Sequence, residues 1–287
     1  MTPMLGLGKT LIKSSNFGQT MALVPASLIT FLPIGSSDTI TSVSIPNFNI
    51  GTTEVTGALW SEVRTWALAN GYTNLSAGTN AGSTSLPIAS VNWYDVIVWL
   101  NAYSERTGLI PVYRDTSGNV LKNGNATTAL DNAVQSNTNG YRLPTANEWE
   151  MAARWLGTTA PTVGSLATQR ITTTNNGVTY YWTPGNYLSG ATEDVNNATE
   201  TQAVAWYSAN AGGTAKAVGG KRENALGMYD VSGNVWEWQF TSTGGTGGVI
   251  RGGSWYDGGS YLTVSFVFIL APSYIGENIG FRLARTV

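Results

Sequence analysis

Two segments in the first half of the chain repeat apolar residues at the three- and four-residue spacing of an amphipathic helix. The first covers residues 56–70, and Gly71 follows it as a residue suited to the left-handed conformation at a helix end. The second covers residues 93–107, with Asn92 as N-cap, Asp95 in the first turn and Gly108 at the end. Their predicted buried stripes are Leu59, Trp60, Val63, Trp66 and Ala67, and Trp93, Val96, Ile97, Leu100 and Tyr103.

A third, short helix is predicted to begin at Thr145 and to end near Gly157, because Thr145 and Glu148 have capping-box spacing before an Ala-rich run. Alternation at period two predicts a strand over residues 43–50, with Pro46 at an edge or a bulge. Residues 157–203 show little periodicity and indicate hairpins and long loops rather than a new core. Short strands separated by glycine clusters follow, so the order of elements predicts an α+β domain.

The region near the C-terminus has a different character. From Gly258 to Gly276 the sequence contains no Asp, Glu, Lys or Arg, and the run Phe-Val-Phe-Ile-Leu at 266–270 does not alternate. Such a run is either a strand buried on both faces or a set of large apolar side chains on the surface. The second arrangement would mark a binding site.

Composition limits the classes of function. The 287 residues suffice for one large domain or two small ones, and we predict an irregular lead-in over residues 1–15 and a single domain over residues 16–287. The 15 basic and 17 acidic residues form no basic stripe, so nucleic acid is not an expected partner. No run of about 18 apolar residues occurs, so we expect no membrane-spanning segment. The low charge and 34 glycines are typical of secreted or cell-surface proteins.

The chain contains neither Cys nor His. This excludes thiolate nucleophiles and disulfides, and it removes the commonest general base and transition-metal ligand. Catalysis would have to depend on carboxylates, Lys or Tyr, and we expect that the protein requires no cofactor.

Four motifs follow one another along the chain: YRLPTANEWE at 141–150, ALGMYDVSGNVWEW at 225–238, VIRGGSW at 249–255 and GFRLAR at 280–285. In this order they resemble the formylglycine-generating-enzyme (sulfatase-modifying factor) branch of the C-type lectin fold. The pieces MALVP at 21–25, GTTEVT at 51–56 and VNWYD at 91–95 extend the resemblance from about residue 16 to the end. The resemblance implies an α+β fold of the C-type lectin class.

The same resemblance argues against catalysis. In the enzymes of that family the catalytic cysteines follow the RGGS-type motif, and Asp257 and Leu262 take those places here. Neither side chain forms a thiolate that binds copper or exchanges with a substrate thiol. Related sulfoxide synthases use histidine-ligated iron, and this chain has no histidine. We therefore expect that the protein is not an enzyme.

A second branch with these motifs is the variable proteins of diversity-generating retroelements, in which a reverse transcriptase rewrites the 3′ end of a gene at template adenines. Randomised AAC codons exclude Gln, Glu, Lys, Met and Trp, and none of these occurs from Tyr256 to Gly276. The resemblance implies a variable region over residues 251–285, where the orientation of Val264 and Val267 stays open. The residues expected to form the exposed ligand-binding set are Tyr256, Asp257, Gly259, Tyr261, Phe266, Phe268, Ile269, Leu270, Tyr274, Gly276 and Asn278.

The motif at 233–238 allows two interpretations. Relatives place a structural calcium here, for which Asn234 and Glu237 would supply oxygen ligands. Alternatively, the two tryptophans of the motif belong to the core and Glu237 pairs with Arg251 or Arg282. We expect Arg142, Arg251 and Arg282 to be internal anchors, since a guanidinium satisfies several buried acceptors.

The resemblance therefore implies a bacterial, secreted or surface-displayed binding protein with an unknown ligand, which we expect to be a protein with an apolar or aromatic contact. One alternative is a non-diversified structural or adhesion paralogue whose apolar run is buried. Another is a sugar-binding lectin, which would need calcium and polar groups, although the segment offers only Asp257 and Asn278.

Overall fold

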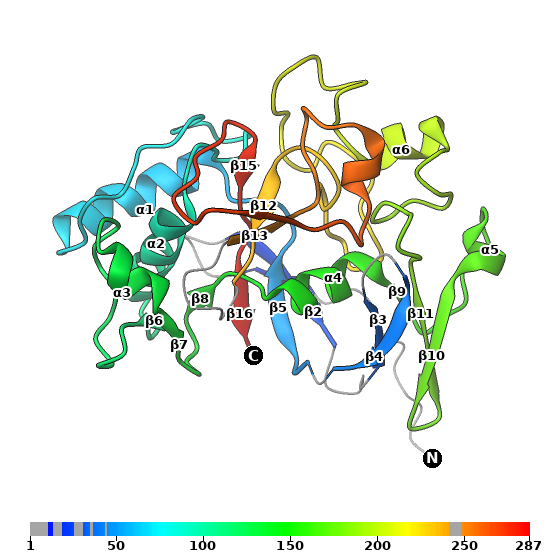
Figure 1. Ribbon diagram of the computed structural model, residues 1–287, viewed down its shortest axis with the longest axis horizontal. Coiled ribbons are helices and arrows are strands. Elements are labelled where there is room, and N and C mark those ends of the chain that lie inside the picture. Colours follow the sequence, from blue (N-terminus) through cyan, green and yellow to red (C-terminus); the bar gives the residue numbers. More distant parts are fainter. Residues whose placement is uncertain (1–10, 14–18, 26–30, 35–36, 44, 241–247) are drawn as a thin grey trace.

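The computed structural model describes residues 11–13, 19–25, 31–34, 37–43, 45–240 and 248–287 (Figure 1). Its helices are α1 (Gly57–Ala69), α2 (Trp93–Arg106), α3 (Thr127–Asp131), α4 (Ala146–Arg154), α5 (Leu166–Gln169), α6 (Ala198–Val204) and the 3-10 helix η1 (Gly259–Leu262). Its strands are β1 (Leu11–Lys13), β2 (Thr20–Val24), β3 (Phe31–Ile34), β4 (Thr39–Ser42), β5 (Phe48–Gly51), β6 (Tyr113–Arg114), β7 (Val134–Gln135), β8 (Tyr141–Arg142), β9 (Trp155–Gly157), β10 (Ile171–Asn175), β11 (Val178–Trp182), β12 (Trp236–Trp238), β13 (Gly248–Arg251), β14 (Phe268–Leu270), β15 (Ile279–Gly280) and β16 (Ala284–Thr286).

The three longest helices begin and end where local sequence places them. The side chain of Thr56 caps α1, that of Asn92 caps α2, and Thr145 and Glu148 form the predicted capping box of α4. These caps satisfy backbone N–H groups that have no partner in the first turn of a helix. The single buried stripe predicted for α2 was too narrow, because every residue from Trp93 to Ser104 is buried.

Two sheets organise the molecule. One is antiparallel, with strand order β1-β2-β5-β16-β8, and it places the C-terminal strand β16 between β5 and β8. The other has the order β14-β13-β12-β15, with β12 and β15 parallel and the remaining pairs antiparallel. Each sheet therefore combines strands that lie far apart in the sequence.

Two strand predictions need correction. The strand expected over residues 43–50 is confirmed only at its end, since β5 begins at Phe48 after Pro46, which has no N–H to donate to a ladder. Leu11–Lys13, expected to be irregular, forms β1 through antiparallel pairing with β2. The rest of the predicted lead-in over residues 1–15 lies outside the described residues.

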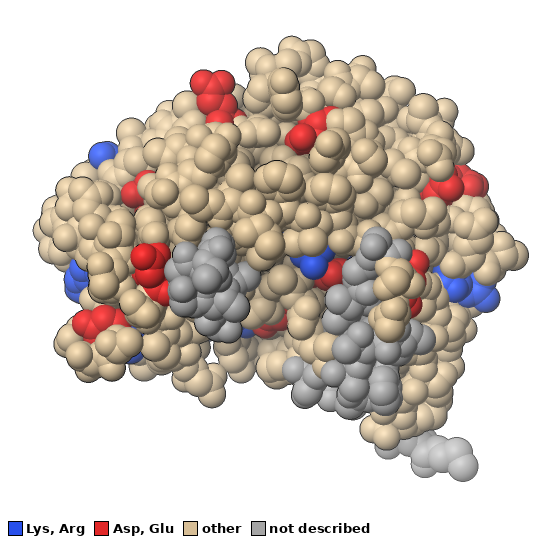
Figure 2. All heavy atoms as spheres, viewed as in Figure 1, with Lys and Arg blue, Asp and Glu red and all other residues tan. Residues whose placement is uncertain are grey.

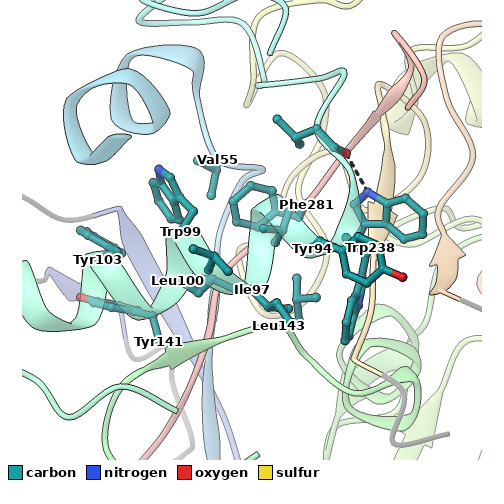
Figure 3. Packing of buried hydrophobic residues seen from close by; sticks show 14 of the residues in the cluster. Val55, Tyr94, Ile97, Trp99, Leu100, Tyr103, Tyr141, Leu143, Trp238 and Phe281 are labelled. Carbon is teal, nitrogen blue, oxygen red and sulfur yellow. Dashed lines mark hydrogen bonds between the residues drawn. The ribbon is translucent and has the colours of Figure 1, made fainter. Parts of the chain in front are cut away.

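The largest core joins α1 and α2 to the C-terminal motif. Trp60 and Trp99 stack with ring centroids 5.3 Å apart, and Phe281 meets Trp99 edge-on at 5.5 Å. Figure 3 shows Phe281 beside Trp99, and Trp238 with a hydrogen bond from its indole N–H to a backbone carbonyl. Aromatic pairs of this kind add to the free energy gained from burial. The sheet β14-β13-β12-β15 is thus fixed to the helices.

Residues 157–203 contain the expected hairpin, β10–β11, but also α5 and α6. The prediction that this region adds no core was wrong in part. Leu188 and Ala191 pack with Leu262 of η1 in a small separate cluster. The reason is that the apolar partner of these residues lies more than 70 positions further on, beyond the reach of a local pattern.

Candidate ligand-binding face

The base of the C-terminal sheet is a buried ion pair. Arg282 donates from Nε to Oε2 of Glu237 at 2.7 Å and from Nη2 to Oε1 at 2.6 Å, and both side chains are fully buried. Trp149 adds a hydrogen bond to Oε2 at 2.7 Å. A forked guanidinium on a carboxylate is a strong and directional contact. It holds β12 against α4 and the chain that follows β15.

The other two predicted anchors are also internal. Arg251 of β13 donates to Glu150 at 2.8 Å, and Glu150 also accepts from Arg154. Arg142 makes a two-pronged pair with Glu148, with both distances 2.7 Å. Since Arg142, Arg251 and Arg282 are all buried, the prediction that they are structural anchors is confirmed.

At the predicted calcium position, the two proposed ligands, Asn234 and Glu237, both form contacts with other residues of the protein. Glu237 is engaged by Arg282 and Trp149, which matches the alternative of an arginine pair, and Trp236 and Trp238 are buried. Asn234 accepts from the backbone N–H of Lys216 at 2.9 Å and donates to its carbonyl. Within the described residues no cluster of three or more acidic side chains that would hold a metal is present. With these partners, Asn234 and Glu237 do not fit a calcium site, and the effect of calcium is left to experiment.

Two further acids surround this ion pair. Burial raises the pKa of Glu54 well above its usual range, and the nearby charge of Asp230 raises it further. Burial also raises the pKa of Asp230 to about 6, against the opposing effect of a hydrogen bond from Gly219. Within the described residues, neither carboxylate oxygen of Glu54 has a hydrogen-bond partner. A protonated acid is the form that such a site favours.

Buried side chains and hydrogen bonds anchor the segment between β13 and β15 to the rest of the protein. Leu262 and Val264 are fully buried, and the hydroxyl groups of Ser232 and Ser265 bond to the carbonyls of Leu262 and Gly185, both at 2.8 Å. Further along, the backbone N–H of Trp93 at the start of α2 bonds to the carbonyl of Pro272. In Figure 1 this segment, coloured orange to red, lies along the upper side of the molecule.

Between these anchors the side chains point outward. Of the twelve large hydrophobic side chains exposed in the described part of the chain, seven lie in residues 256–275, although this segment is a small fraction of the sequence. Tyr256 and Ile269 are 71% and 64% exposed. Figure 2 shows the central upper part of the molecule as almost entirely uncharged, and the few charged atoms there are acidic. We name these seven residues the apolar face: Tyr256, Tyr261, Val267, Phe268, Ile269, Tyr274 and Ile275.

None of the eleven residues expected in the exposed set is buried. The exposed members are Tyr256, Tyr261, Phe268, Ile269 and Tyr274, and the partly exposed ones are Asp257, Gly259, Phe266, Leu270, Gly276 and Asn278. Of the two valines, Val264 is buried and Val267 is exposed. The predicted set omitted Val267 and Ile275, although their apolar neighbours were a sufficient signal to include them.

A pocket of about 280 Å³ opens in this face. All four strands of the sheet β14-β13-β12-β15 contribute to it, together with η1 and the adjoining loops. Trp236 lies behind it, with Phe266 and Phe268 at centroid distances of 6.0 and 6.4 Å. Six members of the expected set line it, and sequence reasoning missed the three from the scaffold, whose role depends on strand pairing. The lining residues are Trp236, Ile250, Asp257, Tyr261, Phe268, Leu270, Tyr274, Asn278 and Ile279.

This combination of helices, small sheets and a looped segment displayed over a buried, ion-paired base is an α+β fold of the C-type lectin class, as the structural neighbours also show. The profile of the family described as "Sulfatase-modifying factor enzyme 1-like domain" matches residues 15–287. The chain belongs to this family.

Individual relatives cover most of the chain. Treponema denticola variable protein 1 superposes with a TM-score of 0.69 at 27% identity, covering 96% of this chain and 98% of its own. The structure of CarF superposes with a TM-score of 0.68 at 25% identity, covering 94% and 99%. A protein named "Chaperone protein LppX", from Paenibacillus barcinonensis, is 28% identical over 274 residues, which are 85% of this chain and 82% of the relative. The chain thus resembles a variable protein within its family. Among the described helices, none is both long and apolar enough to cross a membrane.

Proposed function

We propose that this protein is a non-catalytic binding protein whose C-terminal segment presents a diversified recognition surface. The observation that carries the proposal is the apolar face, since seven large side chains are exposed together on a segment whose base is anchored by buried residues. Contiguous exposed apolar surface on a soluble domain marks an interaction site. Binding residues on loops above a rigid scaffold are a frequent arrangement for recognition.

Three lines of support favour diversification. The chain resembles Treponema denticola variable protein 1 over nearly its whole length. From Tyr256 to Gly276 it contains only residue types that randomised AAC codons allow. Large changes at the exposed positions Tyr256 and Ile269 would leave the core intact, because surface substitutions change stability little.

The ligand in this proposal is a protein. Tyrosine and phenylalanine each bring roughly 150–250 Å² of contact area. Complete burial of one such side chain contributes about 1.5–3 kcal/mol, so three or four reach micromolar affinity after the costs of association. Display of many copies at a bacterial cell surface, which we include in the proposal, would add avidity.

The non-catalytic part of the proposal rests on residue types. Asp257, partly exposed, and Leu262, fully buried, stand where the resemblance places the cysteines of the family's enzymes. A carboxylate and an alkyl group do not perform thiolate chemistry. We propose no required cofactor.

The experiment is deep sequencing of the 3′ end of this gene across a population of the source cells, with a search nearby for an adenine-rich near-copy. Variation confined to codons within residues 256–278, at positions of template adenines, is the expected result. A uniform sequence with no near-copy would overturn diversification and favour a fixed structural or adhesion paralogue.

A further inference from the structure

The pocket in the apolar face has aromatic walls and one acidic group. Trp236, Tyr261, Phe268 and Tyr274 supply the aromatic rings, and Asp257 is the only charged residue in the lining. Among the described residues no Lys or Arg lines the pocket, and the buried Arg251 of β13 is paired with Glu150. Ring faces carry negative potential, so these walls and the carboxylate attract the same kind of group.

The polar end of the pocket offers acceptors. Ser254, fully buried, donates its hydroxyl proton to Oδ2 of Asp257, because an ionised carboxylate can only accept. The Ser254 oxygen then has only acceptor capacity left for Asn278, so Nδ2 of Asn278 donates to it at 3.0 Å. This network uses a donor of Asn278 and orients its amide. Among the described residues, Oδ1 of Asp257 and Oδ1 of Asn278 accept no hydrogen bond.

We propose that this pocket binds a positively charged side chain, arginine or lysine, presented by a protein partner. The inference rests on the proposed function, since it names the chemistry that the same face recognises. A cation within about 6 Å of a ring centroid is attracted by the ring, and Oδ1 of Asp257 supplies a charge-assisted hydrogen bond. In the proposed contact, the basic side chain of the partner occupies the pocket, and apolar side chains surround it.

The surroundings of the pocket favour a side chain of a larger partner over a free small molecule. At about 280 Å³ the pocket lies at the lower limit of the roughly 300–1,000 Å³ of pockets that enclose drug-sized ligands. Tyr256, Ile269 and Ile275 are exposed outside its lining, where they would contact the surface that carries the basic residue. A desolvated arginine surrounded by apolar contacts is a common centre of binding energy in protein interfaces.

The test is selection of random peptides displayed on phage against the wild-type protein. Peptides that bind this face are those that lose binding to Tyr274→Ala. The expected result is that they are enriched in Arg and Lys over the starting library. Asp257→Asn should weaken them about tenfold or more, since it removes the charge-assisted bond. Glu277→Gln is the matched control, because it removes one negative charge from an exposed residue outside the pocket and should change binding little.

Each other outcome overturns the inference in a distinct way. Face-dependent peptides without basic enrichment, bound equally by Asp257→Asn, would refute the cation pocket and leave the proposed function standing. Equal weakening by Asp257→Asn and Glu277→Gln would assign the effect to general charge. If tetramethylammonium chloride binds alone in calorimetry and no basic peptide is selected, the pocket takes a small cation instead.

If no peptide depends on Tyr274, the inference fails. A uniform 3′ sequence would separately refute diversification. Melting temperatures of all variants confirm that they are folded.

Discussion

Arg282 and Glu237 form a bidentate ion pair with both side chains fully buried, and it joins the chain after β15 to the middle of β12. Arg282 also donates to the backbone carbonyls of Gly51 and Tyr229. The pair therefore connects both large sheets to one loop. The apolar face depends on this connection, since its segment lies between β13 and β15, the two strands that pair with β12.

Glu237→Gln should strongly destabilise the protein. The substitution leaves a buried guanidinium without its counter-charge, and breaking a buried pair in this way costs about 3–5 kcal/mol. The control is Glu62→Gln, which removes the ion pair between Glu62 and Arg106 at a site where Glu62 is 48% exposed and should cost no more than about 1 kcal/mol. Urea unfolding measures both. Equal losses in the two variants would contradict the central role of the buried pair.

Chelation distinguishes the ion pair from a calcium site. Because Arg282 and Trp149 already engage the carboxylate of Glu237, we expect the same melting temperature in EDTA and in excess calcium. Calorimetry of the metal-free protein with calcium chloride provides the direct check. A melting temperature that falls on chelation and recovers with calcium would instead support oxygen ligands from Asn234 and Glu237.

Two glycines of the C-terminal segment, Gly253 and Gly258, should differ in how replacement by alanine changes the stability of the protein. At Gly253 φ is +71°, and a β-carbon would lie 2.4 Å from a methyl group of Leu262 and 2.9 Å from the carbonyl oxygen of Tyr261. Gly253→Ala should therefore destabilise the protein by about 1–3 kcal/mol and displace η1. At Gly258 a β-carbon would meet nothing within 4 Å and φ is negative, so Gly258→Ala should be neutral or stabilise by up to about 1 kcal/mol. Thermal unfolding of both variants tests the geometry at the base of the face.

Stability should depend on pH through Asp230. Its pKa in the folded protein is about 6, above the ordinary value of 3.8, because burial disfavours the charged form. The folded state therefore binds this proton more tightly than the unfolded state, and the resulting stability is present below about pH 4 and is lost as the pH rises through 6.

Asp230→Asn removes this titration and suits the backbone, where φ is +54°. The free energy of unfolding of wild type minus that of Asp230→Asn should fall by more than about 1 kcal/mol between pH 4 and pH 7. The difference between the two proteins cancels the titration of carboxylates that do not interact with Asp230. One of these is Glu200, where burial raises the pKa but hydrogen bonds from Arg222 and Thr192 outweigh burial and lower it to about 2. The difference still includes Glu54, whose pKa the charge of Asp230 raises. A difference that stays constant with pH would contradict the raised pKa of Asp230.

Substitutions in the C-terminal segment should separate displayed residues from supporting ones. Ile269 is 64% exposed on the edge strand β14, so Ile269→Thr should change the free energy of unfolding by less than about 0.5 kcal/mol. Leu262 is fully buried, and Leu262→Ala should cost about 2–5 kcal/mol. Similar losses at both positions would favour the paralogue with a buried apolar run. Denaturant unfolding of the two variants gives the comparison.

The sequence by itself determined the local elements and the chemistry that is absent. Thr56, Asn92 and Thr145 begin the three longest helices as predicted, because a cap acts within three residues of its own position. The absence of Cys and His is a property of composition and needs no structure. The ordered motifs likewise identified the fold class, which the family match over residues 15–287 confirms.

Only the tertiary structure decided the orientation and the partners of the critical side chains. Both Arg251 and Arg282 were candidates for Glu237. Strand pairing sets Arg251 opposite Glu237, yet the side chain of Glu237 pairs with Arg282, and the side chain of Arg251 pairs with Glu150 of α4. The run at 266–270 allowed a buried or a displayed strand, and pairing of β14 at the edge of its sheet left Phe268 exposed. The pocket likewise combines residues from four strands. These contacts join positions far apart in the chain, so no local periodicity encodes them.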